Sequence, residues 1–417
     1  MSTGKKNVPE IRFGGFSEPW AQRKLGDMGS TFTGLSGKTK EDFGHGDAKF
    51  ITYMNVYTNA VADLTMTEPI EVDSKQNKVK AGDVFFTTSS ETPEEVGMSC
   101  VMPADMEDTY LNSFCFGYRQ TERLDLNYLA YALRSNSFRE QMVFLAQGIS
   151  RYNISKNKVM EAEIAVPSSD EQSQIGSIFE SLDSLISQHQ HKYDTLVAVK
   201  KAMLEKMFPK EGENVPEIRF VGFTDPWEQR KLEDVARILG GNAWKASDYS
   251  DDGEYLVVTI ANVSGEVIIN DSVGNRISCD NPDVYLLNKG DILVSLTGNV
   301  GRVSKMSNIK GLLNQRVGKI LPNNSDINAD FLFHVLRNPH FERAMIDAGQ
   351  GAAQKNIRND DVLNYAFFLP VEKDEQNIIA HYFNRLDNLI TLHQRKCEVL
   401  KNLKSALLNK MFVNTTE

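Results

Sequence analysis

The feature that most restricts the fold of this chain is an internal repeat. The segment VPEIRFGGFSEPWAQRKL, Val8–Leu25, returns as VPEIRFVGFTDPWEQRKL, Val215–Leu232, with 14 of 18 positions identical at an offset of 207 residues. A second segment, Glu171–Phe208, returns as Glu375–Phe412 with 18 of 38 positions identical at an offset of 204. A repeat of long period indicates one structural unit built more than once. The sequence therefore predicts a tandem duplication of a unit of about 205 residues.

Weaker matches connect the two strong ones. They keep nearly the same offset, and the sequence between them differs from one copy to the other. The matches are Gly34 and Lys38 with Gly241 and Lys245, Leu111-Asn112 with Leu313-Asn314, Leu133-Arg134 with Leu336-Arg337, and Gly148 and Asn153-Ile154 with Gly351 and Asn356-Ile357. The two copies therefore share the ends of the unit, whereas its interior has diverged.

The repeated segment Glu171–Phe208 has the pattern of a long helix. Ser168 and Glu171 form a capping-box pattern directly after Pro167, and the next proline is Pro209. Its 38 residues would extend over roughly 57 Å as a helix. Apolar positions recur at steps of four and three in both copies, the 3.5-residue period of a coiled coil. The expected seam contains Ile175, Phe179, Leu182, Ile186, His189, Leu196 and Met203, and then Ile379, Phe383, Leu386, Ile390, His393, Leu400 and Leu407.

The two seams also match in their polar residues. His189 and Lys200 in the first copy correspond to His393 and Lys404 in the second. Matched polar layers favour a specific partner and register. We therefore expect the two helices to pair with each other as an antiparallel coiled coil, related by a pseudo-twofold axis. The alternative is that each helix packs separately on its own globular unit.

The rest of each copy has the pattern of a mixed α/β domain. Short apolar runs between Gly, Asn and Asp residues predict strands at Lys49–Val56, Asp83–Thr88, Glu254–Ile260 and Asp291–Leu296. One short helix is expected in each copy, at Asn127–Phe144 and at Ala329–Ile346, the second interrupted by Pro339. The predicted fold class is α+β, with globular domains at residues 1–167 and 211–370 and long helices at 168–210 and 371–417.

Composition and charge limit the class of protein. Apolar residues make up 41% and charged residues 24%, as in soluble globular proteins. No apolar run approaches the roughly 18 residues of a membrane span. Four scattered cysteines without a CxxC pair predict a reducing cytoplasm. The net charge is −10, with −5 in each of the halves 1–210 and 211–417. Such acidity counts against nucleic-acid binding, although it is not decisive, because binding depends on the local electrostatic field at the binding face.

Known catalytic motifs are missing from the sequence. GLSGKT at Gly34–Thr39 lacks the first glycine of a phosphate-binding loop, because Phe32 occupies that position. Asn281-Pro282-Asp283 and Asn338-Pro339-His340 lack the second proline and the aromatic residue of an amino-methyltransferase motif. The seven histidines show no metal-ligand spacing, so His189 is expected in the seam. We expect no catalytic activity, metal or cofactor in this chain.

The combination of repeated motifs resembles a known family. PEIRFxGFxxPWxQRKLxD, a variable half, Gly-x4-Asn-Ile, and a helix that begins EQxxI and ends LxKMF all occur twice. This arrangement resembles the DNA-specificity (S) subunit of a type I restriction-modification system, from Val8 to Phe412. The resemblance implies two target recognition domains, each of which reads one half of a split double-stranded DNA target. It implies that the helices form an antiparallel coiled coil that fixes the half-site spacing.

The same resemblance implies protein partners. The helices would dock two modification (methyltransferase) subunits, and restriction subunits with ATP-dependent translocase and nuclease activity would complete the enzyme. S-adenosylmethionine, ATP and magnesium would belong to those partners, in a bacterial or archaeal cytoplasm. This division of labour would account for the missing catalytic motifs.

Candidate DNA-contacting residues follow from side-chain chemistry. Lys38, Lys40 and Lys245 are candidates for phosphate contacts, with solvated surface turns as the alternative. Polar side chains after strands suit base edges, and these are Thr88, Ser89, Ser90, Thr297, Asn299, Arg302, Gln315 and Arg316. Two further loops are groove-reaching segments or simple helix-entry turns, and they contain Arg151, Tyr152, Asn153, Gln354, Lys355 and Asn356. Trp20 and Trp227 are expected to anchor the start of each unit rather than to stack on DNA.

Two other classes of protein remain open from the sequence. A duplicated scaffold that joins two protein partners without touching DNA would agree with the acidic charge, but the matched polar loops count against it. A self-contained restriction-modification enzyme is disfavoured by the missing catalytic motifs. The sequence does not give the bases read, the spacer length or the methylated adenines.

Overall fold

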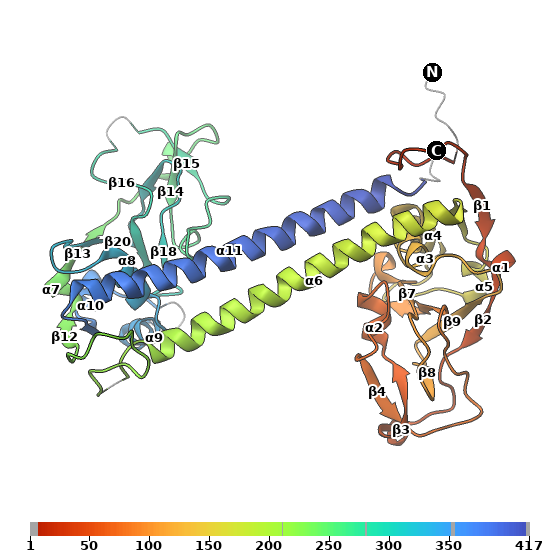
Figure 1. Cartoon of the computed structure of the whole chain (residues 1–417). Helices are drawn as coiled ribbons and strands as arrows, with labels where there is room; N and C mark the ends of the chain where they lie inside the picture. Colours follow the sequence, from red (N-terminus) through yellow and green to blue (C-terminus); the bar gives the residue numbers. More distant parts are fainter. Residues whose placement is uncertain (1–6, 211, 280–281, 352–354, 414–417) are drawn as a thin grey trace. The chain divides into compact units, whose positions relative to one another are not determined.

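The computed structural model describes residues 7–210, 212–279, 282–351 and 355–413. The chain divides into two compact units: unit 1 consists of Met1–Gln190 with Arg395–Glu417, and unit 2 of His191–Gln394. This division cuts both long helices, which are α6 (Ser169–Lys206) and α11 (Lys373–Lys410) in Figure 1. Each unit therefore contains the start of one long helix and the end of the other.

The prediction of two long repeated helices is confirmed. Helices α6 and α11 have 38 residues each, lie within the predicted ranges 168–210 and 371–417, and begin two residues before the repeated segments Glu171–Phe208 and Glu375–Phe412. The sequence assigned Glu171 to a capping box with Ser168. Both of its carboxylate oxygens instead accept hydrogen bonds from Arg12, at 2.6 and 2.8 Å, and one of them also accepts from Trp20 at 3.2 Å. Glu171 thus joins the repeated N-terminal segment to the start of α6.

Unit 1 is built around two small sheets. One has the strand order β2-β9-β5-β7 and the other β4-β3-β8, and two strand pairs, β1-β11 and β6-β10, complete the unit. The strands are β1 Ala21–Lys24, β2 Gly29–Thr33, β3 Phe43–Ile51, β4 Thr67–Ile70, β5 Val84–Thr87, β6 Ser89–Ser90, β7 Ser99–Val101, β8 Thr109–Leu111, β9 Cys115–Gln120, β10 Tyr152–Asn153 and β11 Glu163–Val166. The short helices are α1 Leu25–Met28, η1 Lys40–Asp42, α2 Tyr53–Thr58, η2 Pro93–Glu95, α3 Leu126–Ala132, α4 Asn136–Leu145 and α5 Lys156–Val159.

Unit 2 repeats most of this topology, with a fourth strand in its second sheet and an isolated bridge, Thr297 with Asn356, in place of the pair β6-β10. Its sheets have the orders β13-β20-β17-β18 and β15-β14-β19-β16, with the pair β12-β21 beside them. The strands are β12 Glu228–Lys231, β13 Ala236–Gly240, β14 Tyr255–Val258, β15 Arg276–Ile277, β16 Leu286–Leu287, β17 Ile292–Ser295, β18 Val303–Lys305, β19 Gly311–Leu313, β20 Val317–Pro322 and β21 Ala366–Leu369. The short helices are α7 Leu232–Val235, η3 Ala246–Asp248, α8 Ala329–Leu336, α9 Pro339–Ala348 and α10 Asn359–Leu363. In both units one parallel strand pair, β3-β8 or β14-β19, leads into the site described below.

Three of the four predicted strands are confirmed, as β5, β14 and β17. The prediction of a strand at Lys49–Val56 is wrong in its second half, because β3 ends at Ile51 and α2 begins at Tyr53. The reason is a cap that apolar periodicity does not show. The hydroxyl of Thr52 accepts a hydrogen bond from the backbone N–H of Asn55 at 3.2 Å and starts a helix there.

The single helix predicted at Asn127–Phe144 is also wrong, since the structure has two helices there, α3 and α4. Ser135 lies at the break, and its hydroxyl donates to the carbonyl of Ala132 at 2.7 Å. Unit 2 has the corresponding break where the sequence predicted an interruption at Pro339, between α8 and α9. A polar residue stands at the break in both copies, and in unit 2 the side chain of Asn338 caps α9 by accepting the N–H of His340 at 3.0 Å.

The core of each unit is completed by a phenylalanine that lies two residues after the end of the other copy's long helix. In unit 1, Phe412 from the end of α11 packs against Trp20, Tyr128 and Phe179, with ring centroids 5.7–6.5 Å apart. In unit 2, Phe208 from the end of α6 packs in the same way against Trp227, Phe331 and Phe383, at 5.8–6.0 Å. The two tryptophans are buried, so they anchor the repeated N-terminal segments in the cores.

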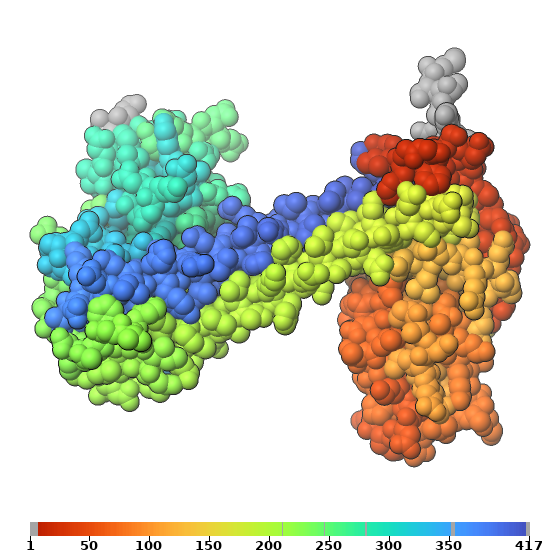
Figure 2. Space-filling view, viewed as in Figure 1, coloured from red at the N-terminus to blue at the C-terminus, as the bar shows by residue number. Residues whose placement is uncertain are grey.

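The repeated N-terminal segments also hold these helix ends by polar contacts. In unit 1 the N–H of Ile11 donates to the carbonyl of Lys410 at 2.9 Å, and Lys410 forms an ion pair with Glu10 at 2.6 Å. Figure 2 shows the end of α11, in blue, against this red segment. In unit 2 the N–H of Ile218 donates to the carbonyl of Lys206 at 2.9 Å, and Lys206 pairs with Glu217 at 2.7 Å. The PEIR sequence is repeated because each unit clamps one helix end with it.

Within each unit the two long helices run antiparallel and contact each other. In unit 1, Asp183 of α6 pairs with Lys404 of α11, while the carbonyl of Ile186, further along α6, faces the thiol of Cys397, which precedes Lys404. In unit 2, Lys200 of α6 pairs with Asp387 of α11. The seam lysines of both copies therefore contact the aspartate at the corresponding position of the opposite helix. The helix starts also pack into the globular cores.

Unit 2 contains a buried histidine that predicts a pH-dependent stability. The side chain of His334 packs on Phe383, and its ring nitrogen Nε2 lies 2.9 Å from Oδ1 of Asn384. Burial lowers the pKa of His334 from 6.5 to about 4, against the opposing charge of Asp387 and with Lys200 and Lys305 nearby. The unfolded chain therefore binds a proton below pH 6.5 that the folded chain binds only near pH 4.

The free energy of unfolding of unit 2 should accordingly fall by up to about 3 kcal/mol as pH drops from about 6.5 to 4. Denaturant unfolding of the wild type and of His334→Phe between pH 4.5 and 7.5 measures this slope. The variant should lack the His334 contribution whatever its absolute stability. Equal slopes in the two proteins would show that His334 does not titrate between the folded and unfolded states in this range.

Candidate DNA interface

In unit 2 three backbone segments that are distant in the sequence lie side by side. The N–H of Leu296, after β17, donates to the carbonyl of Arg316 in the β19–β20 turn at 3.0 Å. The N–H of Ile357, in the loop before α10, donates in turn to the carbonyl of Leu296 at 2.9 Å. Thr297 and Asn356 also form a β-bridge. The strand end, the turn and the loop together make one polar surface.

Four of the sequence-selected residues of unit 2 meet on this surface. Nη1 of Arg316 donates to Oγ1 of Thr297 at 3.2 Å and to Oδ1 of Asn356 at 3.3 Å. Gln315 is exposed beside Arg316 at the tip of the turn. These four side chains line an open groove together with Leu296, Ile357, Arg358, Asn359 and Asp360. The groove offers amide, hydroxyl and guanidinium groups, the chemistry that reads base edges.

Unit 1 has the same arrangement of three backbone segments, the end of the central strand, the turn and the loop, which is called the frame below. The N–H of Thr88, after β5, donates to the carbonyl of Phe114 in the β8–β9 turn at 3.0 Å, and the N–H of Ile154 donates to the carbonyl of Thr88 at 3.0 Å. Strands β6 and β10 pair Ser89 with Asn153. Thr88 thus corresponds to Leu296, Phe114 to Arg316 and Asn153 to Asn356. The structure brings together the candidate segments Thr88–Ser90 and Arg151–Asn153.

Two of the candidate hydroxyl groups of unit 1 already donate hydrogen bonds within the protein. Oγ1 of Thr88 donates to the carbonyl of Phe114 at 2.8 Å, and Ser90 donates to Glu95 at 3.0 Å. Tyr57 donates to the same carboxylate, and these hydrogen bonds, that from Tyr57 foremost, lower the pKa of Glu95. Ser89 and Ser90 are buried, whereas Arg151 and Asn153 are exposed and Tyr152 is half-buried. Among the candidates that meet here, the exposed ones are therefore in the loop before α5 rather than at the strand end.

The β8–β9 turn of unit 1 was missed by the sequence analysis, which selected only its counterpart Gln315-Arg316. The turn presents Ser113 and Phe114, both exposed. The signal that identifies it is the match of Leu111-Asn112 with Leu313-Asn314. Oδ1 of each asparagine accepts the backbone N–H two residues later, at 2.9 Å in Asn112 and 3.3 Å in Asn314, and so shapes the same turn.

The matched glycines of the two units are explained by this turn. A Cβ atom at Gly34 would lie 2.1 Å from the carbonyl oxygen of Asn112, and one at Gly241 would lie 2.2 Å from that of Asn314. Only glycine therefore lets the loop after β2 or β13 pass so closely behind the turn. The repeated loops GLSGK and GNAWK support the candidate site from behind.

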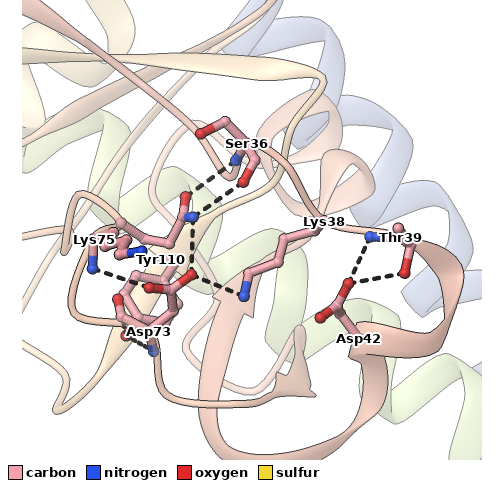
Figure 3. A network of polar contacts seen from close by, with 8 residues as sticks. Ser36, Lys38, Thr39, Asp42, Asp73, Lys75 and Tyr110 are labelled. Carbon is pink, nitrogen blue, oxygen red and sulfur yellow. Dashed lines mark hydrogen bonds and ion pairs between the residues drawn. The ribbon is translucent and has the colours of Figure 1, made fainter.

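The matched lysines of these loops are in different environments. Lys38 forms an ion pair with Asp73 at 2.9 Å, and its side chain is only 13% exposed (Figure 3). The carboxylate of Asp73 also accepts hydrogen bonds from the N–H of Lys75 at 3.0 Å and from Gln76 at 3.1 Å. The hydrogen bond from Lys38 is the main cause of the lowered pKa of Asp73. Lys245, in contrast, is exposed, which leaves it better placed than Lys38 to meet a phosphate.

The remaining candidates are spread over both units. Lys40 is exposed at the start of η1, and Asn299 is exposed in the turn after β17. Arg302 is directed towards Glu342 of α9, at 3.9 Å, and Lys355 donates to the carbonyl of Ile346. Gln354 lies outside the described residues. The four described positions therefore lie at the periphery of the two equivalent frames.

The seam candidates lie on the buried side of the long helices. Those that are fully buried are Ile175, Phe179, Leu182, Ile379, Phe383 and Leu386. Those that are half-buried are Ile186, His189, Leu196, Met203, Ile390, His393, Leu400 and Leu407. Among the described residues there is no group of three or more side chains arranged to hold a metal ion, and no helix long and apolar enough to span a membrane.

Comparison with known proteins identifies the class to which this doubled fold belongs. The family model of the type I restriction modification DNA specificity domain matches residues 17–197 and again residues 224–402. The chain therefore belongs to the family of type I restriction-modification DNA specificity subunits, which recognise DNA and are not catalytic. The resemblance and the fold class inferred from the repeats are confirmed.

Individual relatives cover the chain almost completely. The MjaVIII type I restriction enzyme specificity subunit of Methanocaldococcus jannaschii is 27% identical over 375 residues, 86% of this chain and 84% of that protein. A putative MjaX specificity subunit from the same organism is 23% identical over 421 residues, 97% and 95% of the two chains. The crystal structure of the type I S subunit from M. genitalium matches with a TM-score of 0.62 at 15% identity, over 98% of this chain and 100% of that one, and shows the same fold.

Proposed function

We propose that the chain reads a split double-stranded DNA target, and that unit 1 and unit 2 each recognise one half of it. The observation that carries this proposal is the doubled frame. The same three backbone segments meet in both units, but the side chains at the tip of the turn differ, Ser113-Phe114 against Gln315-Arg316. A conserved frame with changed side chains suits two readers of different sequences.

The side chains divide into two classes of DNA contact. Gln315, Arg316 and Asn356 in unit 2 and Arg151 and Asn153 in unit 1 carry amide and guanidinium groups for base edges. The exposed Lys40 and Lys245 suit phosphates, which position a protein without reading sequence. Thr88, Ser89, Ser90, Tyr152, Thr297, Asn299, Arg302, Gln354 and Lys355 are retained as supporting candidates. The ion pair with Asp73 gives Lys38 a sufficient structural role.

We further propose that α6 and α11 form one antiparallel coiled coil that sets the half-site spacing and docks two modification subunits. The contacts Asp183–Lys404 and Lys200–Asp387 support a defined register. Apolar side chains remain exposed on both helices, at Leu185, Val199, Leu392, Val399 and Leu403. Restriction subunits would bind the same assembly, and S-adenosylmethionine, ATP and magnesium would be held by these partners. The assembly would act in the cytoplasm of its bacterial or archaeal host.

The first experiment is a genome-wide map of adenine methylation in a host that expresses the modification subunit with and without this chain. We expect a split asymmetric motif, methylated on both strands, that disappears when the chain is absent. If no motif depends on the chain, purified complex is tested for binding to a pool of random duplexes. Binding without any sequence preference would refute DNA reading and favour the protein-scaffold alternative.

A further inference from the structure

We propose that Phe114 and Arg316 are the paired specificity residues of the two units, each selecting one base pair of its half-site. Arg316 selects a guanine, and Phe114 selects a thymine at the equivalent position of the other half-site. This inference rests on the proposed function, because it assumes that each unit reads a half-site. It adds Phe114, whose apolar side chain gave no polar signal in the sequence.

The equivalence of the two residues is fixed by their backbone contacts. The carbonyl of each accepts the N–H of the first residue after the central strand, Thr88 for Phe114 and Leu296 for Arg316, at 3.0 Å in both. The N–H of each donates to the asparagine side chain two residues earlier, Asn112 or Asn314. Two residues held by the same pair of contacts occupy the same place in the frame, and so address the same position of a half-site.

Arg316 is preorganised for a bidentate contact. Its Nη1 is held by Thr297 and Asn356, and no other acceptor among the described residues contacts the guanidinium. Nε and Nη2 therefore remain as a pair of parallel donors in an open groove. Two parallel donors match the O6 and N7 acceptors of guanine in the major groove.

Phe114 presents an apolar edge at the same place. The residue is 56% exposed, while its backbone N–H and carbonyl are both engaged within the frame. A single exposed phenylalanine carries little information, since many apolar side chains are exposed in folded proteins. Its position as the counterpart of Arg316 is what gives it meaning. Aromatic and other apolar side chains contact the methyl group of thymine, which distinguishes that base in the major groove.

The experiment uses the complex of the full chain with its modification subunits and measures methylation of a duplex library in which every half-site position is varied. Phe114→Ala should relax a thymine preference in one half-site only, and Arg316→Ala a guanine preference in the other half-site only. Each should lower discrimination at its base pair roughly 5- to 150-fold and leave the opposite half-site unchanged. Phe144→Ala, on the exposed surface of α4, and Arg343→Ala, on that of α9, are matched controls that should keep the wild-type motif.

A reciprocal substitution sharpens the test. Phe114→Arg should change the preferred base of the first half-site from thymine towards guanine. An unchanged motif in all three variants, with thermal unfolding equal to that of the wild type, would overturn the inference. The inference would also be overturned if the Phe114 variants methylated all sequences more weakly without a change of preferred base. That result would mean that Phe114 acts as a non-specific wedge between bases. A wild-type complex without any motif would instead refute the proposed function itself.

Discussion

Replacing Phe412 by alanine should destabilise unit 1 by about 3–5 kcal/mol, the usual cost of removing a buried aromatic side chain. The ring of Phe412 fills the space between Trp20, Tyr128 and Phe179, and it reaches this core from the end of the second copy's helix. Its loss leaves a cavity and also weakens the attachment of the end of α11 to unit 1. A loss of this size is a large part of the net free energy of unfolding of a small domain, so partial unfolding of unit 1 is expected.

Hydrogen–deuterium exchange resolved by peptide measures this effect unit by unit. Peptides from β1, α3 and the start of α6 should exchange faster in Phe412→Ala, while those of unit 2 stay close to wild type. Phe208→Ala should show the reverse pattern, because Phe208 packs with Trp227, Phe331 and Phe383. Phe144→Ala, at a side chain that is 88% exposed, serves as the control without an effect. Faster exchange confined to unit 2 in Phe412→Ala would contradict the crossed arrangement of the helix ends.

The second large effect is expected from Asp387→Ala. The carboxylate of Asp387 is 5% exposed and accepts hydrogen bonds from Lys200 and from Arg337, the latter at 3.3 Å. Removing one member of a buried ionic group leaves uncompensated charge and costs about 3–5 kcal/mol. Burial already lowers the pKa of Lys200, and without Asp387 it should fall further.

The corresponding aspartate of the other unit provides the control. Asp183 pairs with Lys404 and accepts a hydrogen bond from Tyr131 at 2.7 Å, but its side chain is 39% exposed. Asp183→Ala should therefore cost only about 1–2 kcal/mol. Urea unfolding of the two variants gives the comparison. Lys200→Met combined with Asp387→Leu should recover only the part of the loss that comes from Lys200, because the buried charge of Arg337 stays without its carboxylate partner. Equal losses of unfolding free energy in Asp387→Ala and Asp183→Ala would show that burial does not determine how much these ion pairs contribute to stability.

The fold was largely predictable because its strongest signals are local or repeated. The 3.5-residue apolar period and the repeat predicted both long helices, and alternation of apolar runs with Gly and Asn predicted three strands. The errors lie at Thr52 and Ser135, whose hydroxyls form hydrogen bonds with the backbone where one helix begins and another ends. Apolar periodicity does not register one side-chain hydrogen bond.

The candidate site was predictable only where its chemistry is polar. Thr297, Gln315, Arg316 and Asn356 were selected as types that suit base edges, and they line one groove. Phe114 was missed because an aromatic residue in a turn reads as core, and Lys38 was selected although it is bound by Asp73. The partner of Lys38 is 35 residues away in the sequence, and nothing local indicates it.

By itself, the sequence determined that one unit is built twice, that each copy ends in a long helix, and that the interiors differ. Only the tertiary structure decided that each globular core is completed by the helix end of the other copy. The physical reason is that an uninterrupted 38-residue helix carries its end roughly 57 Å from its start, so Phe208 cannot return to the core where α6 begins. The two phenylalanines end the same Lys-Met-Phe sequence, and long-range packing assigns each to its core.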